Sequence, residues 1–136
     1  MPFWRLHYHL VWTTSGRQSL IDDSAERIIH TSIASTSRSL NLIPHAVGIV
    51  SDHIHVVASI PPTVSISEAI GRLKGASSHA VNDRAARTSP FRWQREYGAL
   101  SVSDRGLPIV TEYALNQRQR HSSNDLILTL ERIESE

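Results

Sequence analysis

The stretch SDHIHVVASIPP, residues 51–62, decides the fold that we predict for this chain. Its apolar run has the length of a β-strand and stops at a double proline, which cannot donate hydrogen bonds to a β-ladder. Alternate side chains of a strand face opposite sides of the sheet, so His53 and His55 share one face. The other face is apolar throughout and suits packing against helices. Two histidines are therefore expected on one side of a central strand.

The flanking sequence predicts four strands and three helices around this stretch. Alternation predicts strands at residues 5–13, 42–50, 53–60 and 91–102, and helical spacing predicts helices at residues 24–40, from Ser65, and from Pro108 to about Arg120. Capping-box patterns begin at Asp23 and at Ser65. The order predicts an α+β fold of the ferredoxin-like split βαβ type with an added C-terminal helix. The first two helices would cover one sheet face and leave the other open.

Composition limits the class of protein. The 136 residues fit one domain, expected to span residues 1–136, and 40% of them are hydrophobic, which is enough for a core. Cysteine is absent, which excludes disulfides and thiolate metal sites. No apolar run approaches the length of a membrane span, and the N-terminus resembles a strand more than a signal peptide, so we expect a cytoplasmic protein. Residues 122–136 are expected to form a docking tail.

Positive charge is concentrated in the middle of the chain. The formal net charge is only +1, but residues 72–120 carry eight Arg and one Lys against four acids, net +5. Such a local field can bind phosphate groups without making the whole protein basic. A solvated helix face would give the same charge pattern.

Three residue pairs could take part in chemistry. His53 and His55 are close enough on one strand face to hold a single cation, and imidazole is a common metal ligand. His7 and His9 have the same spacing, so spacing alone does not show which pair binds metal, or whether either does. On the predicted C-terminal helix, Tyr113 and a glutamine four residues later share a face and offer a nucleophile and an oxygen ligand, although packing is an ordinary role for such a tyrosine.

A set of five stretches, in this order, resembles a known family. They are LHYHLVWTT, DHIHVVASIPP, VSISEAIGRLKGASS, FRWQREYGALSVS and EYALNQRQRH. Together they resemble the HUH class of nucleases, and more narrowly the single-tyrosine transposases of insertion sequences, including the REP-associated members. The similarity extends over nearly the whole chain.

The resemblance implies a function. It makes His53, His55 and Gln117 the ligands of a divalent metal, Mg²⁺ or Mn²⁺, and Tyr113 the nucleophile that forms a 5′-phosphotyrosine. It implies cleavage and rejoining of single-stranded DNA beside an imperfect hairpin. It also implies a homodimer, in many members with exchange of the tyrosine helix between subunits.

DNA contacts are expected mainly from the basic segment. The candidates are Arg72, Lys74, Arg84, Arg87, Arg92, Arg95 and also His9. His9 has a second interpretation as a partner of the metal ligands, and Trp93 either stacks on a base or packs in the core. Relatives often carry basic residues where Ser15-Gly16 and Ala76 stand here, so the DNA contacts are less well specified than the catalytic set.

Other functions stay open at this point. A domesticated relative would bind hairpin DNA without cleaving it. A histidine-based nucleotide hydrolase would need a third histidine where Val57 stands, and replication initiators or relaxases are usually longer. Tyr8 and Tyr97 are rival nucleophiles, but Tyr97 has no glutamine four residues later.

Overall fold

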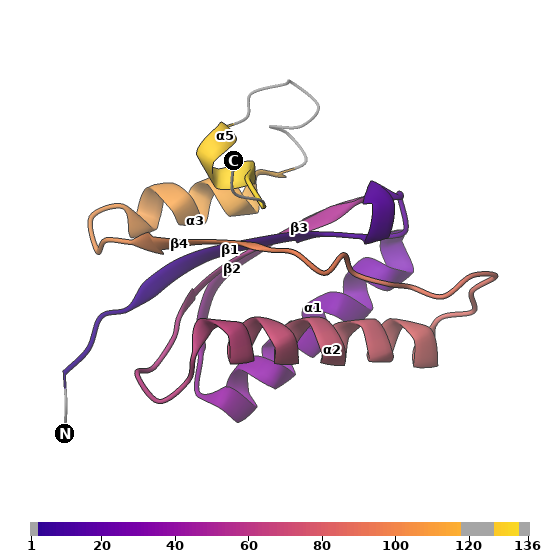
Figure 1. Ribbon diagram of the computed structural model, residues 1–136, viewed down its shortest axis with the longest axis horizontal. Helices are drawn as coiled ribbons and strands as arrows, with labels where there is room; N and C mark the ends of the chain where they lie inside the picture. The colour runs from indigo at the N-terminus through magenta and orange to yellow at the C-terminus, as the bar shows by residue number, and fades with distance from the viewer. Residues whose placement is uncertain (1–2, 118–126, 134–136) are drawn as a thin grey trace.

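The computed structural model describes residues 3–117 and 127–133, which form a sheet between two helical layers (Figure 1). The antiparallel sheet has the order β2-β3-β1-β4. Its strands are β1 (His7–Thr13), β2 (Ile43–Val50), β3 (His53–Ser59) and β4 (Gly98–Val102), and a short 3₁₀ turn, η1 (Ser15–Arg17), follows β1. Helices α1 (Asp23–Leu40) and α2 (Ile66–Arg84) cover one face, while α3 (Leu107–Leu115) and the single turn α5 (Leu128–Glu131) lie over the other. The predicted α+β arrangement with an added C-terminal helix is confirmed.

The main core lies between the sheet and the first two helices. Leu10 and Trp12 of β1 and Ile54 and Val56 of β3 are fully buried there. These positions alternate along each strand, as the period of two requires. Burial of each such side chain contributes roughly 1.5–3 kcal/mol relative to exposure. Trp93 packs edge-to-face against Trp12 at the margin of this core. Of the two roles considered for Trp93, packing against the core is therefore confirmed.

The helix starts follow from local capping. Ser65 accepts a hydrogen bond from the backbone N–H of Glu68 at 3.1 Å and caps α2 as predicted. The cap of α1 is Asp22, whose carboxylate accepts from the N–H of Ala25 at 2.8 Å. This helix therefore begins at Asp23, one residue earlier than predicted.

The fourth strand is shorter than predicted. It begins at Gly98, and within residues 91–97 only Trp93 forms a bridge, with Thr14. The reason lies in Lys74 on α2, whose Nζ donates to the carbonyl oxygens of residues 94, 95 and 96 at 2.5–3.3 Å. Because these carbonyls accept hydrogen bonds from an ammonium group and not from a neighbouring strand, residues 94–96 lie against α2, and β4 begins only at Gly98.

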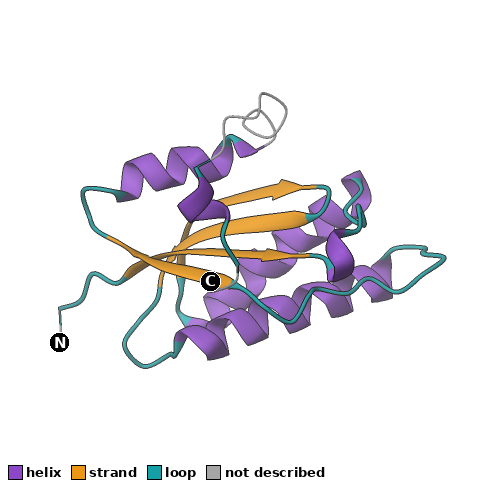
Figure 2. Cartoon of the chain, turned by 45° about the horizontal axis from the view of Figure 1, so that its top comes forward, coloured by secondary structure: helices purple, strands orange, loops and turns teal. Residues whose placement is uncertain are grey.

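The second sheet face is covered, which differs from the expected open face. Helix α3 packs on β2 and β3, while α5 contacts β1 and β4 (Figure 2). His53 and His55 are consequently only 4% and 0% exposed. The predicted helix end near residue 120 and residues 122–126 and 134–136 of the expected tail lie outside the described residues. Within the described part of the chain, no helix is long and apolar enough to cross a membrane.

Candidate active site

Two glycines bring the covering segments close to His55. Gly48 on β2 is the register partner of His55, and Gly98 on β4 lies in the same row across the sheet. A Cβ atom at Gly48 would lie 1.7 Å from the carbonyl oxygen of Ala114, and one at Gly98 would lie 1.9 Å from that of Arg132. Only glycine permits such close backbone approach. Helix α3 and the C-terminal segment can therefore meet the sheet on either side of the histidine.

Tyr113 projects from α3 into this row. It is fully buried, and its ring lies edge-on to that of His55 with centroids 5.8 Å apart. The hydroxyl accepts a hydrogen bond from the backbone N–H of Ile127 at 3.1 Å and donates one to Glu131 Oε2. Burial and the hydrogen bond to Glu131 raise the pKa of Tyr113 to about 12. The phenol is therefore a protonated donor at neutral pH, held beside the histidine pair.

A carboxylate joins the two histidines. Glu131 Oε1 lies 3.1 Å from His55 Nε2 and 3.3 Å from His53 Nε2. One ligand atom from each of these three residues lies within 4.8 Å of the others. Burial raises the pKa of Glu131, but hydrogen bonds from the two histidines hold it far below its usual range. The other ring nitrogen of His53, Nδ1, lies 2.8 Å from the Asp52 carboxylate. Burial lowers the pKa of His53, but the carboxylates of Glu131 and Asp52 raise it overall.

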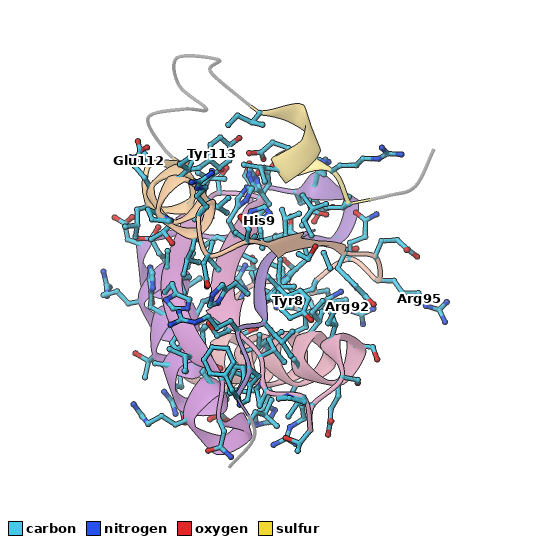
Figure 3. All side chains as sticks on the ribbon, turned by 90° about the vertical axis from the view of Figure 1, so that its left-hand side faces the viewer. Tyr8, His9, Arg92, Arg95, Glu112 and Tyr113 are labelled. Carbon is cyan, nitrogen blue, oxygen red and sulfur yellow. The ribbon has the colours of Figure 1, made fainter. Side chains whose placement is uncertain are left out.

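His9 lies directly behind His55. Its Nε2 is 2.7 Å from His55 Nδ1, and the side chain has no exposed surface. Burial, followed by the charge of His55, lowers the pKa of His9 to about 3, so this imidazole is neutral. In Figure 3, His9 and Tyr113 lie on the same side of the sheet. Such burial does not fit the DNA contact expected from the sequence, whereas it fits a partner that orients His55.

Gln117 lies one turn after Tyr113 and is 1% exposed. Its Nε2 donates to the backbone carbonyl of Tyr113 at 3.0 Å. With Gly48 and residues of α1, it lines a pocket of roughly 320 Å³. The structure thus places Tyr113, His53 and His55 in one cluster, and Gln117 is buried just after the end of α3.

A second polar cluster fixes the start of α3. Ser59 Oγ is 2.7 Å from both His7 Nδ1 and His45 Nε2, while His7 Nε2 meets the Asp104 carboxylate at 2.6 Å. The hydrogen bond from His7 lowers the pKa of Asp104, and burial, with the charge of His7, lowers that of His45. Asp104 belongs to the connection between β4 and α3, so this cluster ties the tyrosine helix to β1.

The basic candidates divide into two groups. Four of the candidates are exposed and accessible to a ligand: Arg72, Arg84, Arg92 and Arg95. Arg92 and Arg95 project outward beside a groove of roughly 460 Å³ between α2 and residues 91–97 (Figure 3). Lys74, whose pKa burial lowers, instead holds the segment described above. Arg87 donates to the carbonyl of Leu20 at 3.1 Å.

The rival tyrosines lie elsewhere. Tyr8 packs against the main core, on the other side of the sheet from Tyr113 (Figure 3). Tyr97 is 37% exposed in the segment before β4. Of the three tyrosines, Tyr113 is the one that contacts the His53–His55 pair.

Comparison with known proteins identifies the family of this chain. Residues 2–117 match the family model described as "Transposase IS200 like". The chain belongs to this family. Among curated IS200-like relatives, the transposases of insertion sequence element IS200 from Salmonella typhimurium and Salmonella typhi are each 29% identical over 75 residues. The match covers 55% of this chain and spans about half, 49%, of each relative's length.

Two solved structures share the fold of this IS200-like chain. A candidate transposase from Deinococcus radiodurans R1 superposes with a TM-score of 0.68 at 22% identity, covering 82% of this chain and 90% of that one. A REP-associated tyrosine transposase bound to a REP hairpin also gives 0.68, at 14% identity, covering 89% and 74%. The resemblance inferred from the sequence is confirmed at the level of family and fold.

Sequence reasoning missed Glu131 and Asp52. Glu131 lies 76 residues beyond His55 in an acidic end of the chain, where a carboxylate is expected to be solvated. Asp52 directly precedes His53, and this adjacency was a usable signal for an orienting carboxylate.

Proposed function

We propose that this chain is a metal-dependent transposase that cleaves and rejoins single-stranded DNA through a covalent bond to Tyr113. The observation that carries the proposal is the burial of the Tyr113 hydroxyl in one cluster with His53 and His55. Membership of the IS200-like transposase family supports it. The hairpin bound by the REP-associated structure supports a substrate that contains a hairpin.

The residues present fit a divalent metal. Imidazole nitrogens and carboxylate oxygens converge within 4.8 Å, and mixed nitrogen and oxygen donors suit Mn²⁺ and, less strongly, Mg²⁺. We propose that His53 and His55 hold the ion, with Gln117 as a further oxygen ligand. Such an ion would polarise the scissile phosphate and stabilise charge on the leaving 3′-oxygen.

Tyr113 supplies the nucleophile in this proposal. Its Oη forms a bond to phosphorus while the bond from phosphorus to the 3′-oxygen breaks; the phenol loses its proton and the 3′-oxygen gains one. The resulting 5′-phosphotyrosine keeps the energy of the phosphodiester, so another strand end can be joined without an external energy source.

Single-stranded DNA is the proposed partner. Exposed Arg72, Arg84, Arg92 and Arg95 would contact its phosphates, whereas the donors of Lys74 and Arg87 are used within the chain and would support the segment that carries Arg92 and Arg95. Helix α3 packs on the sheet of its own chain. A homodimer, with or without exchange of this helix, stays a proposal that sedimentation analysis with and without DNA would test.

The proposed function predicts a covalent protein–DNA adduct. Single-stranded DNA from the flanks of this chain's gene, including any hairpin, would be incubated with Mn²⁺ or Mg²⁺ and analysed on a denaturing gel. We expect an adduct that disappears with EDTA and is absent with fully duplex DNA. Tight hairpin binding without an adduct in either metal would contradict the enzyme and favour the hairpin-binding alternative.

We also predict that His9 acts through His55. When His55 offers Nε2 to a metal, its proton resides on Nδ1 and donates to the neutral His9 at 2.7 Å. Replacing His9 by Leu removes this acceptor and should lower Mn²⁺ affinity by about 10- to 100-fold. His9→Gln, which keeps an acceptor, should retain more affinity. Equal Mn²⁺ titrations for wild type and His9→Leu would contradict this role.

A further inference from the structure

The C-terminal turn α5 places a carboxylate between the histidine pair and Tyr113. The two oxygens of Glu131 face different partners: Oε1 lies 3.1 Å and 3.3 Å from the Nε2 atoms of His55 and His53, and Oε2 accepts the Tyr113 hydroxyl. The side chain is only 15% exposed. A carboxylate used merely for solubility would not be held in this position by three side chains.

We propose that Glu131 is a metal ligand through Oε1 and at the same time orients the phenol of Tyr113 through Oε2. This inference rests on the proposed function and deepens it. It makes the C-terminal segment part of the catalytic centre. It also makes all of the proposed ligands, together with the nucleophile, available from one chain.

Charge supports this role. Two neutral imidazoles and one amide carry no negative charge with which to balance a divalent cation. Hard cations such as Mg²⁺ and Mn²⁺ prefer oxygen ligands, and carboxylates supply most of the compensating charge in protein sites. Among the described residues, the other carboxylate beside the pair is Asp52, which contacts His53 at Nδ1, the nitrogen that faces away from Glu131. Asp52 is therefore placed to orient His53, and Glu131 is placed to share the ion.

The sheet is shaped to receive this segment. Gly98 lies beneath the backbone of Arg132, the residue directly after Glu131, and a Cβ there would come within 1.9 Å of the Arg132 carbonyl oxygen and 2.9 Å of Val11 Cγ1. Any side chain at this position would lift the segment away from β4. The close approach that brings Glu131 to the histidines thus depends on a glycine in another part of the chain.

The test measures metal binding without DNA, by titrating Mn²⁺ and following free Mn²⁺ by electron paramagnetic resonance. We expect Glu131→Ala and Glu131→Gln to weaken Mn²⁺ binding by about 10- to 100-fold, more than Gln117→Ala does. Asp83→Ala, which removes an exposed acid on α2, is the matched control and should bind as wild type. Circular dichroism would verify that each variant is folded.

Gly98→Ala provides a second, independent variant because it keeps the carboxylate but should displace it. Weakened Mn²⁺ binding in this variant supports the proposal. Unchanged Mn²⁺ affinity in Glu131→Ala would overturn the proposal. Formation of more DNA adduct by Glu131→Ala than by wild type would also overturn it, because Glu131 would then be occupying the place of the phosphate. Weakened Mn²⁺ binding in a protein that never forms an adduct would leave Glu131 as a ligand and contradict the proposed function instead.

Discussion

Alanine at either His53 or His55 is expected to remove Mn²⁺ binding and to reduce formation of the DNA adduct to background. Both imidazoles direct Nε2 toward the same carboxylate oxygen, so each provides one of the few nitrogen donors in the cluster. They are 4% and 0% exposed, so solvent cannot substitute freely for the lost ligand. We expect at least about a 100-fold loss of metal affinity, the upper end of what loss of an orienting partner causes.

His79→Ala is the matched control for these variants. His79 is exposed on α2, on the other side of the sheet, and its removal should leave both measurements unchanged. Wild-type Mn²⁺ affinity in either His53→Ala or His55→Ala would show that the pair is not the metal site. His53 and His55 would then be a buried polar pair that only stabilises the fold through its contacts with Glu131.

Alanine at Gly48 is expected to inactivate the protein without removing any functional group. The new methyl carbon would lie 1.7 Å from the backbone oxygen of Ala114, and 2.9 Å from Cγ of Gln117. The backbone of a helix cannot rotate out of the way as the end of a flexible side chain can, so α3 must move away from the sheet to relieve this clash. Misplacement of a reacting group by about 1 Å can cost roughly 100-fold in rate, and overpacking typically costs about 1–3 kcal/mol of stability. Adduct formation should therefore fall by about that factor.

Gly71→Ala separates this effect from a general effect of glycine replacement. A Cβ at Gly71 meets nothing within 4 Å, and the residue lies within α2, where alanine should stabilise the helix by roughly 0.5–1 kcal/mol. Hydrogen exchange of residues 107–117 should rise in Gly48→Ala and stay unchanged in Gly71→Ala. Adduct formation at the wild-type rate in Gly48→Ala would contradict the packing of Tyr113 described above.

The fold could be predicted because its signals are local. Alternation at residues 53–60 and capping at Ser65 act within a few residues, and they specify strands and helices whose order allows few topologies. The fourth strand was predicted too long because Lys74, distant in sequence, binds the carbonyls of residues 94–96. Tertiary hydrogen bonds of this kind leave no periodic pattern.

The candidate site could be predicted only in its short-range parts. His53 and His55 share a strand face by period two, and Tyr113 and Gln117 share a helix face by an interval of four. Spacing could not show that these faces meet, and the family resemblance supplied that link. Glu131 had no comparable signal. The same holds for Gly48 and Gly98, since the need for a glycine depends on the backbone that approaches it.

The central claim is that Tyr113, beside the histidine pair, becomes covalently linked to a cleaved single strand. The most direct test is tandem mass spectrometry of the adduct formed by wild-type protein with single-stranded DNA and Mn²⁺, with Tyr113→Phe analysed in parallel. We predict one modified peptide, carrying a 5′-phosphodeoxynucleotide on Tyr113, and no adduct in the variant. Modification of Tyr8 or Tyr97, or an adduct that persists in Tyr113→Phe, would contradict the account.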